Sequence, residues 1–186
     1  MNKSQMAEII SYIFSPVFET PLIILLTMMI NKTKDYWITI LILTLVFVYL
    51  LPWLLFRLLM SLGKISDTDI TKRQERHLFF TGILIFFVIY MLFLYFINET
   101  SLFYFYLKLL IPFLCFFTIN FFWKISGHML VNSIFILLLY FYIDKSYIII
   151  MGLLLLFLIG WSRIILKKHS LSQVLAGSFL AGLLFI

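Results

Sequence analysis

The sequence predicts an all-α protein, a polytopic membrane bundle of six or seven transmembrane helices. Of its 186 residues, 64% are hydrophobic and 12% are charged, whereas soluble domains carry about 25% charged residues. The apolar residues form long continuous runs without a period of two. Such runs favour helices over a barrel, because a helix satisfies its own backbone polar groups within lipid.

Seven apolar segments have lengths near the roughly 20 residues that a membrane-spanning helix needs. The first is short and contains Pro16, Glu19 and Pro21, so it either spans the membrane or lies partly in the interface. We expect a single domain over residues 1–186, and no cleavable signal peptide at its start. The seven segments cover residues 16–30, 37–62, 78–97, 102–123, 127–143, 146–162 and 171–186.

Six polar links separate these segments and fall into two groups. Three are short, at 31–36, 98–101 and 144–145, and each predicts a helical hairpin. The other three are the polar loops, at 63–77, 124–128 and 163–170. If all seven segments span, the three polar loops lie on one side of the membrane, where they can meet.

Positive charge is concentrated on the side of the polar loops. Two interpretations stay open: Lys and Arg accumulate on the cytoplasmic side of membrane proteins, or they gather to bind an anion. The cations of that side are Lys64, Lys72, Arg73, Arg76, Lys124, Arg163, Lys167 and Lys168, with Lys3 if the first segment spans, against Lys32, Lys34 and Lys145 on the other.

The polar loops also carry the residue types that bind and cleave phosphate esters. A guanidinium matches phosphate bidentately, a glycine lets backbone N–H groups approach a ligand, and a serine adds a hydroxyl donor. Two imidazoles beside a phosphate suggest a nucleophile and an acid. These residues are Arg73 and Arg76 in the first loop, Ser126, Gly127 and His128 in the second, and Arg163 and His169 in the third.

Two of the loops resemble motifs of the type 2 phosphatidic acid phosphatase superfamily. The third motif of that family is Ser-Arg, five residues, His, three residues and Asp, and SRIILKKHSLSQ at 162–173 has this spacing with Gln173 in the last position. The second motif is Pro-Ser-Gly-His, and SGH at 126–128 follows Ile125 instead of proline. The resemblance is strongest over residues 63–180.

The first motif of the family is degenerate in this chain. It is usually Lys, six residues and Arg-Pro. With Arg76 as its arginine, Asp69 occupies the lysine position and His77 the proline position. We expect Arg73 to supply the missing cation.

The resemblance implies a phosphatase that hydrolyses a lipid phosphate or pyrophosphate through a phosphohistidine. In this mechanism His169 attacks phosphorus and His128 protonates the leaving oxygen. No metal or other cofactor is expected, because the sequence lacks the carboxylate clusters that a Mg²⁺ site would use. The phosphate oxygens would be held by Arg73, Arg76, Ser126, Gly127 and Arg163.

Gln173 replaces the aspartate that orients the nucleophilic histidine in the family. A glutamine can accept the imidazole N–H through its carbonyl oxygen, but it supplies no negative charge. Slower turnover, a different orienting group and an inactive enzyme all remain open.

The expected partner is a membrane lipid phosphate whose headgroup enters the cationic pocket while its chain stays in the bilayer; no nucleic acid is expected. The alternatives are a lipid phosphotransferase and a catalytically impaired lipid-binding or scaffold protein of the same fold. A transporter is disfavoured by the few ionisable groups in the segments.

Charge counting favours a cytoplasmic site, whereas the resemblance favours the outer face of a bacterial inner membrane. The sequence leaves the lipid and the oligomeric state open.

Overall fold

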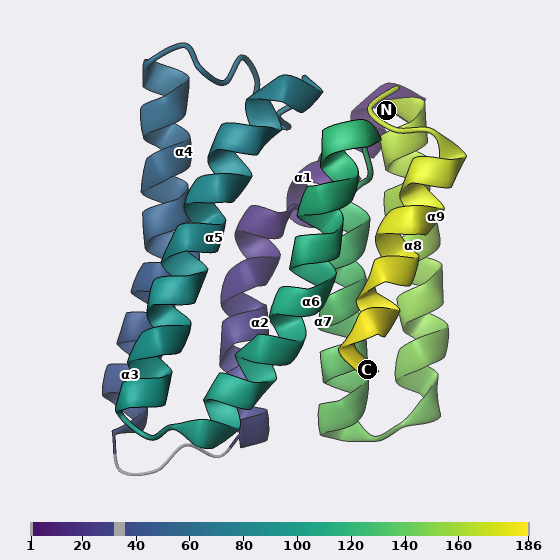
Figure 1. Ribbon diagram of the computed structural model, residues 1–186. Coiled ribbons are helices and arrows are strands. Elements are labelled where there is room, and N and C mark those ends of the chain that lie inside the picture. Colours follow the sequence, from purple (N-terminus) through teal and green to yellow (C-terminus); the bar gives the residue numbers. More distant parts are fainter. Residues whose placement is uncertain (1, 32–35, 186) are drawn as a thin grey trace. The chain divides into compact units, whose positions relative to one another are not determined.

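A computed structural model describes residues 2–31 and 36–185, and these residues form helices joined by turns and loops, with no strand among them (Figure 1). The all-α prediction is confirmed. The predicted link at 31–36, with Lys32 and Lys34, lies largely outside the described residues. The helices are α1 (Lys3–Ile13), α2 (Pro16–Asn31), α3 (Trp37–Thr44), η1 (Leu45–Leu50), α4 (Leu51–Ser61), α5 (Arg73–Phe96), α6 (Thr100–Phe122), α7 (Gly127–Ile143), α8 (Ser146–Ile165), α9 (Leu171–Leu180) and η2 (Ala181–Phe185).

Five helical stretches in the described part of the chain are long and apolar enough to cross a membrane. These are Lys3–Asn31, Trp37–Ser61, Arg73–Phe96, Thr100–Phe122 and Ser146–Ile165. Two shorter apolar helices cover Gly127–Ile143 and Leu171–Leu184. All seven predicted segments are therefore helical, and the five long apolar stretches are typical of an integral membrane protein.

The first segment is longer than the sequence predicted, because α1 precedes it. Asn2 caps α1 by accepting from the Gln5 backbone N–H at 2.9 Å, and the Gln5 side chain accepts from the Asn2 N–H at 3.0 Å. Such reciprocal bonds satisfy two of the N–H groups left open at a helix start. The break between α1 and α2 precedes Pro16, which begins α2, where its missing N–H leaves no bond unmade.

The second segment contains a π-helical turn, η1, immediately before a proline. The Leu51 N–H donates to the Val46 carbonyl, one residue further back than in an α-helix. Pro52 has no N–H and its ring crowds the carbonyl four residues earlier. A wider turn at this point accommodates the proline ring while α3, η1 and α4 remain one continuous helical stretch.

The described residues form two compact units. Unit 1 comprises Met1–Leu26 and Lys124–Ile186, and unit 2 comprises Thr27–Trp123. The division falls within α2 and directly after α6. Each unit holds at least one polar loop, and each is described separately below.

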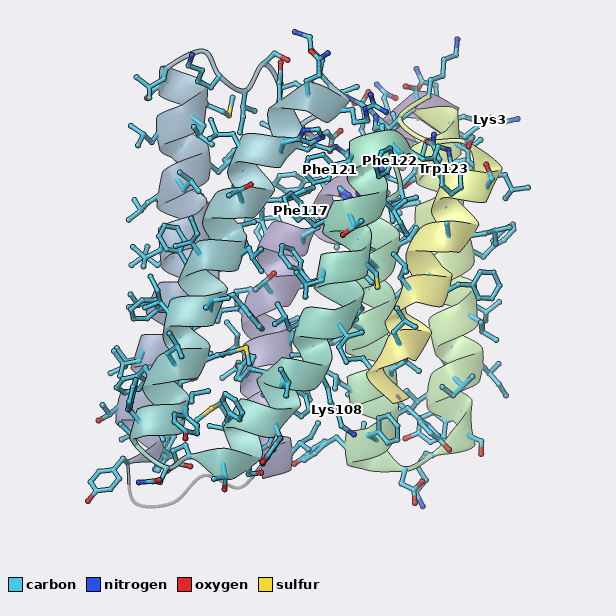
Figure 2. The ribbon with its side chains drawn as sticks, viewed as in Figure 1. Lys3, Lys108, Phe117, Phe121, Phe122 and Trp123 are labelled. Carbon is cyan, nitrogen blue, oxygen red and sulfur yellow. The ribbon has the colours of Figure 1, made fainter. Side chains whose placement is uncertain are left out.

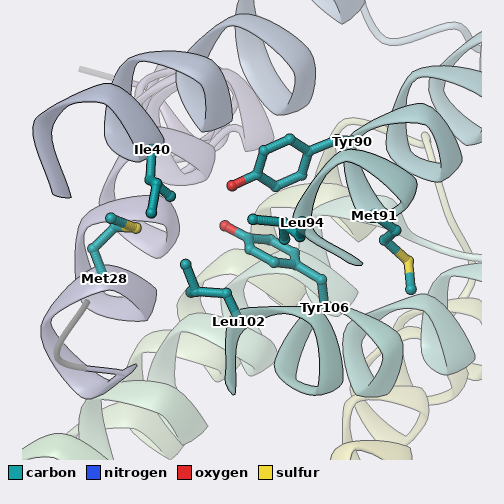
Figure 3. Close-up of a cluster of buried hydrophobic side chains, with 7 residues drawn as sticks. All are labelled: Met28, Ile40, Tyr90, Met91, Leu94, Leu102 and Tyr106. Carbon is teal, nitrogen blue, oxygen red and sulfur yellow. The ribbon is translucent and has the colours of Figure 1, made fainter. Parts of the chain in front are cut away.

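Unit 2 is built around a cluster of large side chains. Tyr90 and Tyr106 are almost fully buried, with ring centroids 5.4 Å apart in an edge-to-face arrangement. Figure 3 shows their hydroxyl groups on the same side of the cluster, facing Met28 and Ile40. The Tyr90 hydroxyl is hydrogen-bonded to the Thr44 hydroxyl. This cluster joins α2, α3, α5 and α6.

The hairpin between α5 and α6 confirms the predicted short link at 98–101. Asn98 adopts a left-handed backbone conformation, with φ of 59°, which asparagine tolerates better than most residues. On α6, Figure 2 shows Lys108 toward the end that begins at Thr100, and Phe117, Phe121, Phe122 and Trp123 toward the opposite end. A lysine near a helix end can extend its ammonium group to the interface.

Unit 1 contains the predicted hairpin between α7 and α8. Asp144 ends α7 in a left-handed conformation, with φ of 53°. Ile10 of α1 and Phe14, directly after the helix, pack against a buried cluster of Met129, Ile159 and Val174. These contacts join α1, α7, α8 and α9. Lys3 lies at the end of unit 1 where α7 and α9 begin (Figures 1 and 2).

Candidate active site

The second polar loop forms the start of α7. Ser126 is fully buried and caps the helix, with its hydroxyl oxygen accepting from the Met129 N–H at 3.4 Å. A hydroxyl that accepts one bond keeps its own proton to donate. Gly127 and His128 form the first turn of α7, where the helix dipole and open N–H groups attract anions. The capping role and the predicted phosphate-binding role of Ser126 are therefore compatible.

The third polar loop starts later than the sequence predicted, because Arg163 lies in the last turn of α8. The helix ends in a Schellman turn: the Lys167 N–H donates to the Ile164 carbonyl at 2.9 Å, and the Lys168 N–H to the Arg163 carbonyl at 3.0 Å. Lys167 holds the left-handed position of this turn, with φ of 54°. The His169 N–H also donates to the Arg163 carbonyl, at 3.3 Å. The five residues between Arg163 and His169 thus form the end of α8 and the turn that follows it.

His169 is held by Gln173 at the start of α9. The imidazole is buried, and its Nδ1 lies 3.2 Å from Gln173 Oε1. The same oxygen accepts from the Ser170 backbone N–H at 3.2 Å, as part of a capping box that begins α9. A backbone N–H can only donate, so the amide atom facing it is the oxygen, and Nδ1 of His169 must carry the proton in its own contact. In the neutral imidazole the lone pair is then on Nε2.

Backbone and side-chain contacts connect the second and third loops. The Ser126 N–H donates to the Gln173 carbonyl at 3.2 Å, and Lys124 Nζ donates to the Lys168 carbonyl at 2.9 Å. A Cβ on Gly177 would lie 2.5 Å from the Ser126 carbonyl oxygen. The glycine therefore allows α9 to approach the backbone of the second loop. Together these contacts place the two predicted histidine loops at one end of unit 1.

The arginines of the first polar loop belong to unit 2, in the first turn of α5. Arg73 is exposed and its Nη1 donates to the Phe122 carbonyl at 2.6 Å. Arg76 is buried; its Nε donates to the Ile70 carbonyl and its Nη1 to Asn120 Oδ1, each at 2.8 Å. Both arginines are thus at the end of unit 2 where α6 finishes. Their participation in one phosphate site with His169 stays a prediction.

The residues at the remaining first-motif positions have other partners. His77, in the proline position, lies against Phe121 with ring centroids 4.2 Å apart. The loop before α5 is shaped by Asp67, whose Oδ1 accepts from the backbone N–H groups of Asp69 and Thr71 at 3.0 and 3.2 Å. The Asp67 carboxylate thus serves in turn formation, as expected for an Asx turn.

Comparison with known protein families covers the part of the chain that contains both histidine loops. Residues 119–186 match the family model of the PAP2 superfamily. The resemblance predicted from the sequence is thereby confirmed over this PAP2 segment. No curated protein and no solved structure matches the chain.

The PAP2 segment contains the second and third motifs and excludes the degenerate first motif. Its family supports phosphatase-type activity. Three residues that contact these loops were not assigned a site role from the motifs: Lys124, Ser170 and Gly177. The sequence singled out Lys124 only as a cation of the polar loops, and Ser170 has a capping-box pattern, a serine followed three residues later by glutamine. Gly177 had no sequence signal.

Proposed function

We propose that the protein is a membrane phosphatase that hydrolyses a lipid phosphate or pyrophosphate through a phosphohistidine at His169. The observation that carries this proposal is the contact between His169 Nδ1 and Gln173 Oε1 at 3.2 Å. With Gln173 Oε1 as the acceptor, a neutral His169 imidazole carries its lone pair on Nε2, as nucleophilic attack requires. Arg163, whose carbonyl accepts from the His169 N–H, supplies a guanidinium in the same unit.

The proposed reaction has two steps. Nε2 of His169 attacks phosphorus, a P–N bond forms, and the P–O bond to the leaving group breaks while His128 protonates the leaving oxygen. Water then attacks phosphorus, His128 takes a proton from it, and the P–N bond breaks to release phosphate and His169. Phosphoryl transfer depends mainly on positioning and charge stabilisation, which agrees with a site made of guanidinium, hydroxyl and N–H donors.

Five residues are proposed to bind the phosphate oxygens. Ser126 and the Gly127 N–H act at the positive end of α7, and Arg163 acts from the end of α8. Arg73 and Arg76 complete the site if the first polar loop meets the other two. Gln173 orients the imidazole without adding charge, so the phosphohistidine intermediate lacks the stabilisation that an aspartate would give.

The substrate is proposed to be a lipid because the site lies at the ends of apolar helices, where a headgroup can enter while its chain remains in the bilayer. The family resemblance supports an outward-facing site in a bacterial inner membrane. Phosphatidate, phosphatidylglycerol phosphate and polyprenyl pyrophosphate all present the chemistry that this site would recognise.

The test is phosphate release by detergent-purified protein from these three lipids, with His169→Ala beside the wild type. Loss of a catalytic nucleophile lowers turnover by several orders of magnitude, so we expect at least about a thousandfold decrease. His77→Ala is the matched control, because this histidine lies against Phe121 in unit 2. Equal release by wild type and His169→Ala would show that His169 is not the nucleophile.

Two other outcomes identify the alternatives. Transfer of the phosphoryl group to an added lipid alcohol in preference to water would indicate a phosphotransferase. Failure of the wild type to release phosphate from any of the lipids would favour the lipid-binding or scaffold protein of the same fold.

A further inference from the structure

We propose that Ser11 on α1 is a positioning residue that orients the Arg163 guanidinium for phosphate binding. Nη1 of Arg163 donates a hydrogen bond to Ser11 Oγ. Both side chains are buried, with exposed fractions of 1% for Arg163 and 7% for Ser11. Ser11 lies 152 residues away in sequence and outside the PAP2 segment. The inference rests on the proposed function, because it requires Arg163 to bind phosphate.

Ser11 is a fixed acceptor because α1 is held on both sides of it. Ile10 and Phe14 pack into the cluster formed by Met129, Ile159 and Val174. In addition, the Phe14 carbonyl accepts from Asn132 Nδ2 at 3.1 Å, which connects the end of α1 to α7. Because α1 is held by these contacts, the Ser11 hydroxyl fixes the direction of the hydrogen bond that it accepts from Arg163.

The contact with Ser11 fixes a second point of Arg163. Its backbone carbonyl already accepts from the N–H groups of Lys168 and His169. The backbone that carries the Arg163 side chain is therefore held by the loop that contains His169. Ser11 then sets the far end, the rotation of the planar guanidinium. A guanidinium has five N–H groups, so the bond to Ser11 is compatible with bidentate binding of phosphate. Holding this fork in place before the ligand arrives reduces the entropy lost on binding.

A purely structural role for Ser11 is the competing explanation. A buried guanidinium needs acceptors, and Ser11 could serve only to stabilise the fold. The two roles differ in their consequences: a structural role changes the free energy of unfolding alone, whereas a positioning role changes phosphate affinity and depends on Arg163.

The experiment measures the dissociation constant of inorganic phosphate, from the rise in Tm as phosphate is added, for the full-length protein in detergent. We expect Ser11→Ala to weaken phosphate binding about tenfold, the effect of one hydrogen bond to a charged group. Ser11→Thr retains the hydroxyl and should restore the wild-type affinity. The matched control is Ser133→Ala, because Ser133 is also buried in unit 1 while its Oγ makes no hydrogen bond with any described residue.

A double-mutant cycle with Arg163→Lys separates the two roles. If Ser11 acts through the guanidinium fork, Ser11→Ala has no further effect on phosphate affinity when lysine is present. Wild-type affinity in Ser11→Ala, or an equal loss in both backgrounds, would overturn the proposal. So would a wild-type protein that binds no phosphate.

The same proteins also distinguish failure of this proposal from failure of the proposed function. If wild type binds phosphate but releases none from the lipid panel, the proposed phosphatase is wrong and the phosphate affinities still decide the role of Ser11. If wild type is active, kcat should fall in Ser11→Ala and recover in Ser11→Thr, parallel to the affinities.

Discussion

Units 1 and 2 are both helical and apolar, but different kinds of residue stabilise them. Most ring–ring contacts among the described residues lie in unit 2, where Tyr90 and Tyr106 form the centre of an aromatic cluster. Both units also pack at glycines, but the neighbouring atoms differ. In unit 2 a Cβ on Gly82 would meet only the Leu55 side chain, at 2.2 Å, whereas in unit 1 a Cβ on Gly177 would lie 2.5 Å from the Ser126 backbone carbonyl oxygen. Unit 1 therefore brings two backbones close together at a small residue.

This difference shows what a site at a membrane surface requires. Lipid tails are as apolar as the side chains of the helices, so burying apolar surface does not drive helices together in a bilayer. They associate instead through close packing and hydrogen bonds. Large rings achieve this packing without bringing backbones together. The loops around Ser126 and His169 must come within hydrogen-bonding distance of each other, and only small residues permit such an approach. Substitutions in the two units should therefore affect different properties.

The largest expected effect is on the stability of unit 2, from Tyr106→Ala. Removing a buried aromatic ring leaves a cavity and costs about 3–5 kcal/mol of unfolding free energy. Thermal unfolding in detergent would measure this loss. Tyr104→Ala is the control, because Tyr104 is on the same helix and is 62% exposed. A loss of no more than that of the control would show that the aromatic cluster does not stabilise unit 2.

The next effect is on catalysis in unit 1, from Gln173→Leu. Leucine removes the acceptor for both the Ser170 N–H and His169 Nδ1. We expect kcat for phosphate release to fall about a hundredfold, less than the ~10⁴-fold known for loss of an oriented carboxylate in a triad. Gln173→Glu retains an oxygen in both contacts and should be at least as active as wild type. An unchanged kcat in Gln173→Leu would mean that another group orients His169.

Gly177→Ala tests the close approach of α9 to the second loop. Its Cβ would lie 2.5 Å from a backbone oxygen that cannot rotate away, so the helix must shift, at a cost of about 1–3 kcal/mol. Unlike Tyr106→Ala, this variant should also lower phosphate release at temperatures where it remains folded. Gly182→Ala is the control, since its new Cβ would have no neighbour within 4 Å among the described residues beyond its own turn of helix. Normal activity in folded Gly177→Ala would show that the close packing of α9 against the second loop is not needed for phosphate release.

The smallest expected effect is a gain in stability from Lys167→Gly. Lys167 occupies the left-handed position of the turn after α8, which costs a residue with a Cβ about 1–2 kcal/mol and glycine none. Part of the gain is lost because glycine has more entropy when unfolded, so we expect Tm to rise slightly with no change in kcat. A fall in kcat would give the Lys167 side chain a part in substrate binding.

The helical segments and the loops that contain the proposed site residues could be predicted from the amino-acid sequence. Long apolar runs allow only helices, and the short links at 98–101 and 144–145 allow only hairpins. The closeness of Arg163 and His169 could also be predicted from their spacing, because the turn between them is fixed by local hydrogen bonds. The start of the first segment was not predicted, since α1 carries polar residues and is stabilised by its Asn2–Gln5 capping box.

Tertiary structure decided which residues far apart in the sequence contact the predicted site. The contact of Gln173 with His169, in which Oε1 lies 3.2 Å from Nδ1, is local by comparison. No local pattern linked Ser11 to Arg163, or Gly177 to Ser126. Such contacts depend on the rotation and separation of packed helices, which are set by the side chains between them and not by the spacing of residues along the chain.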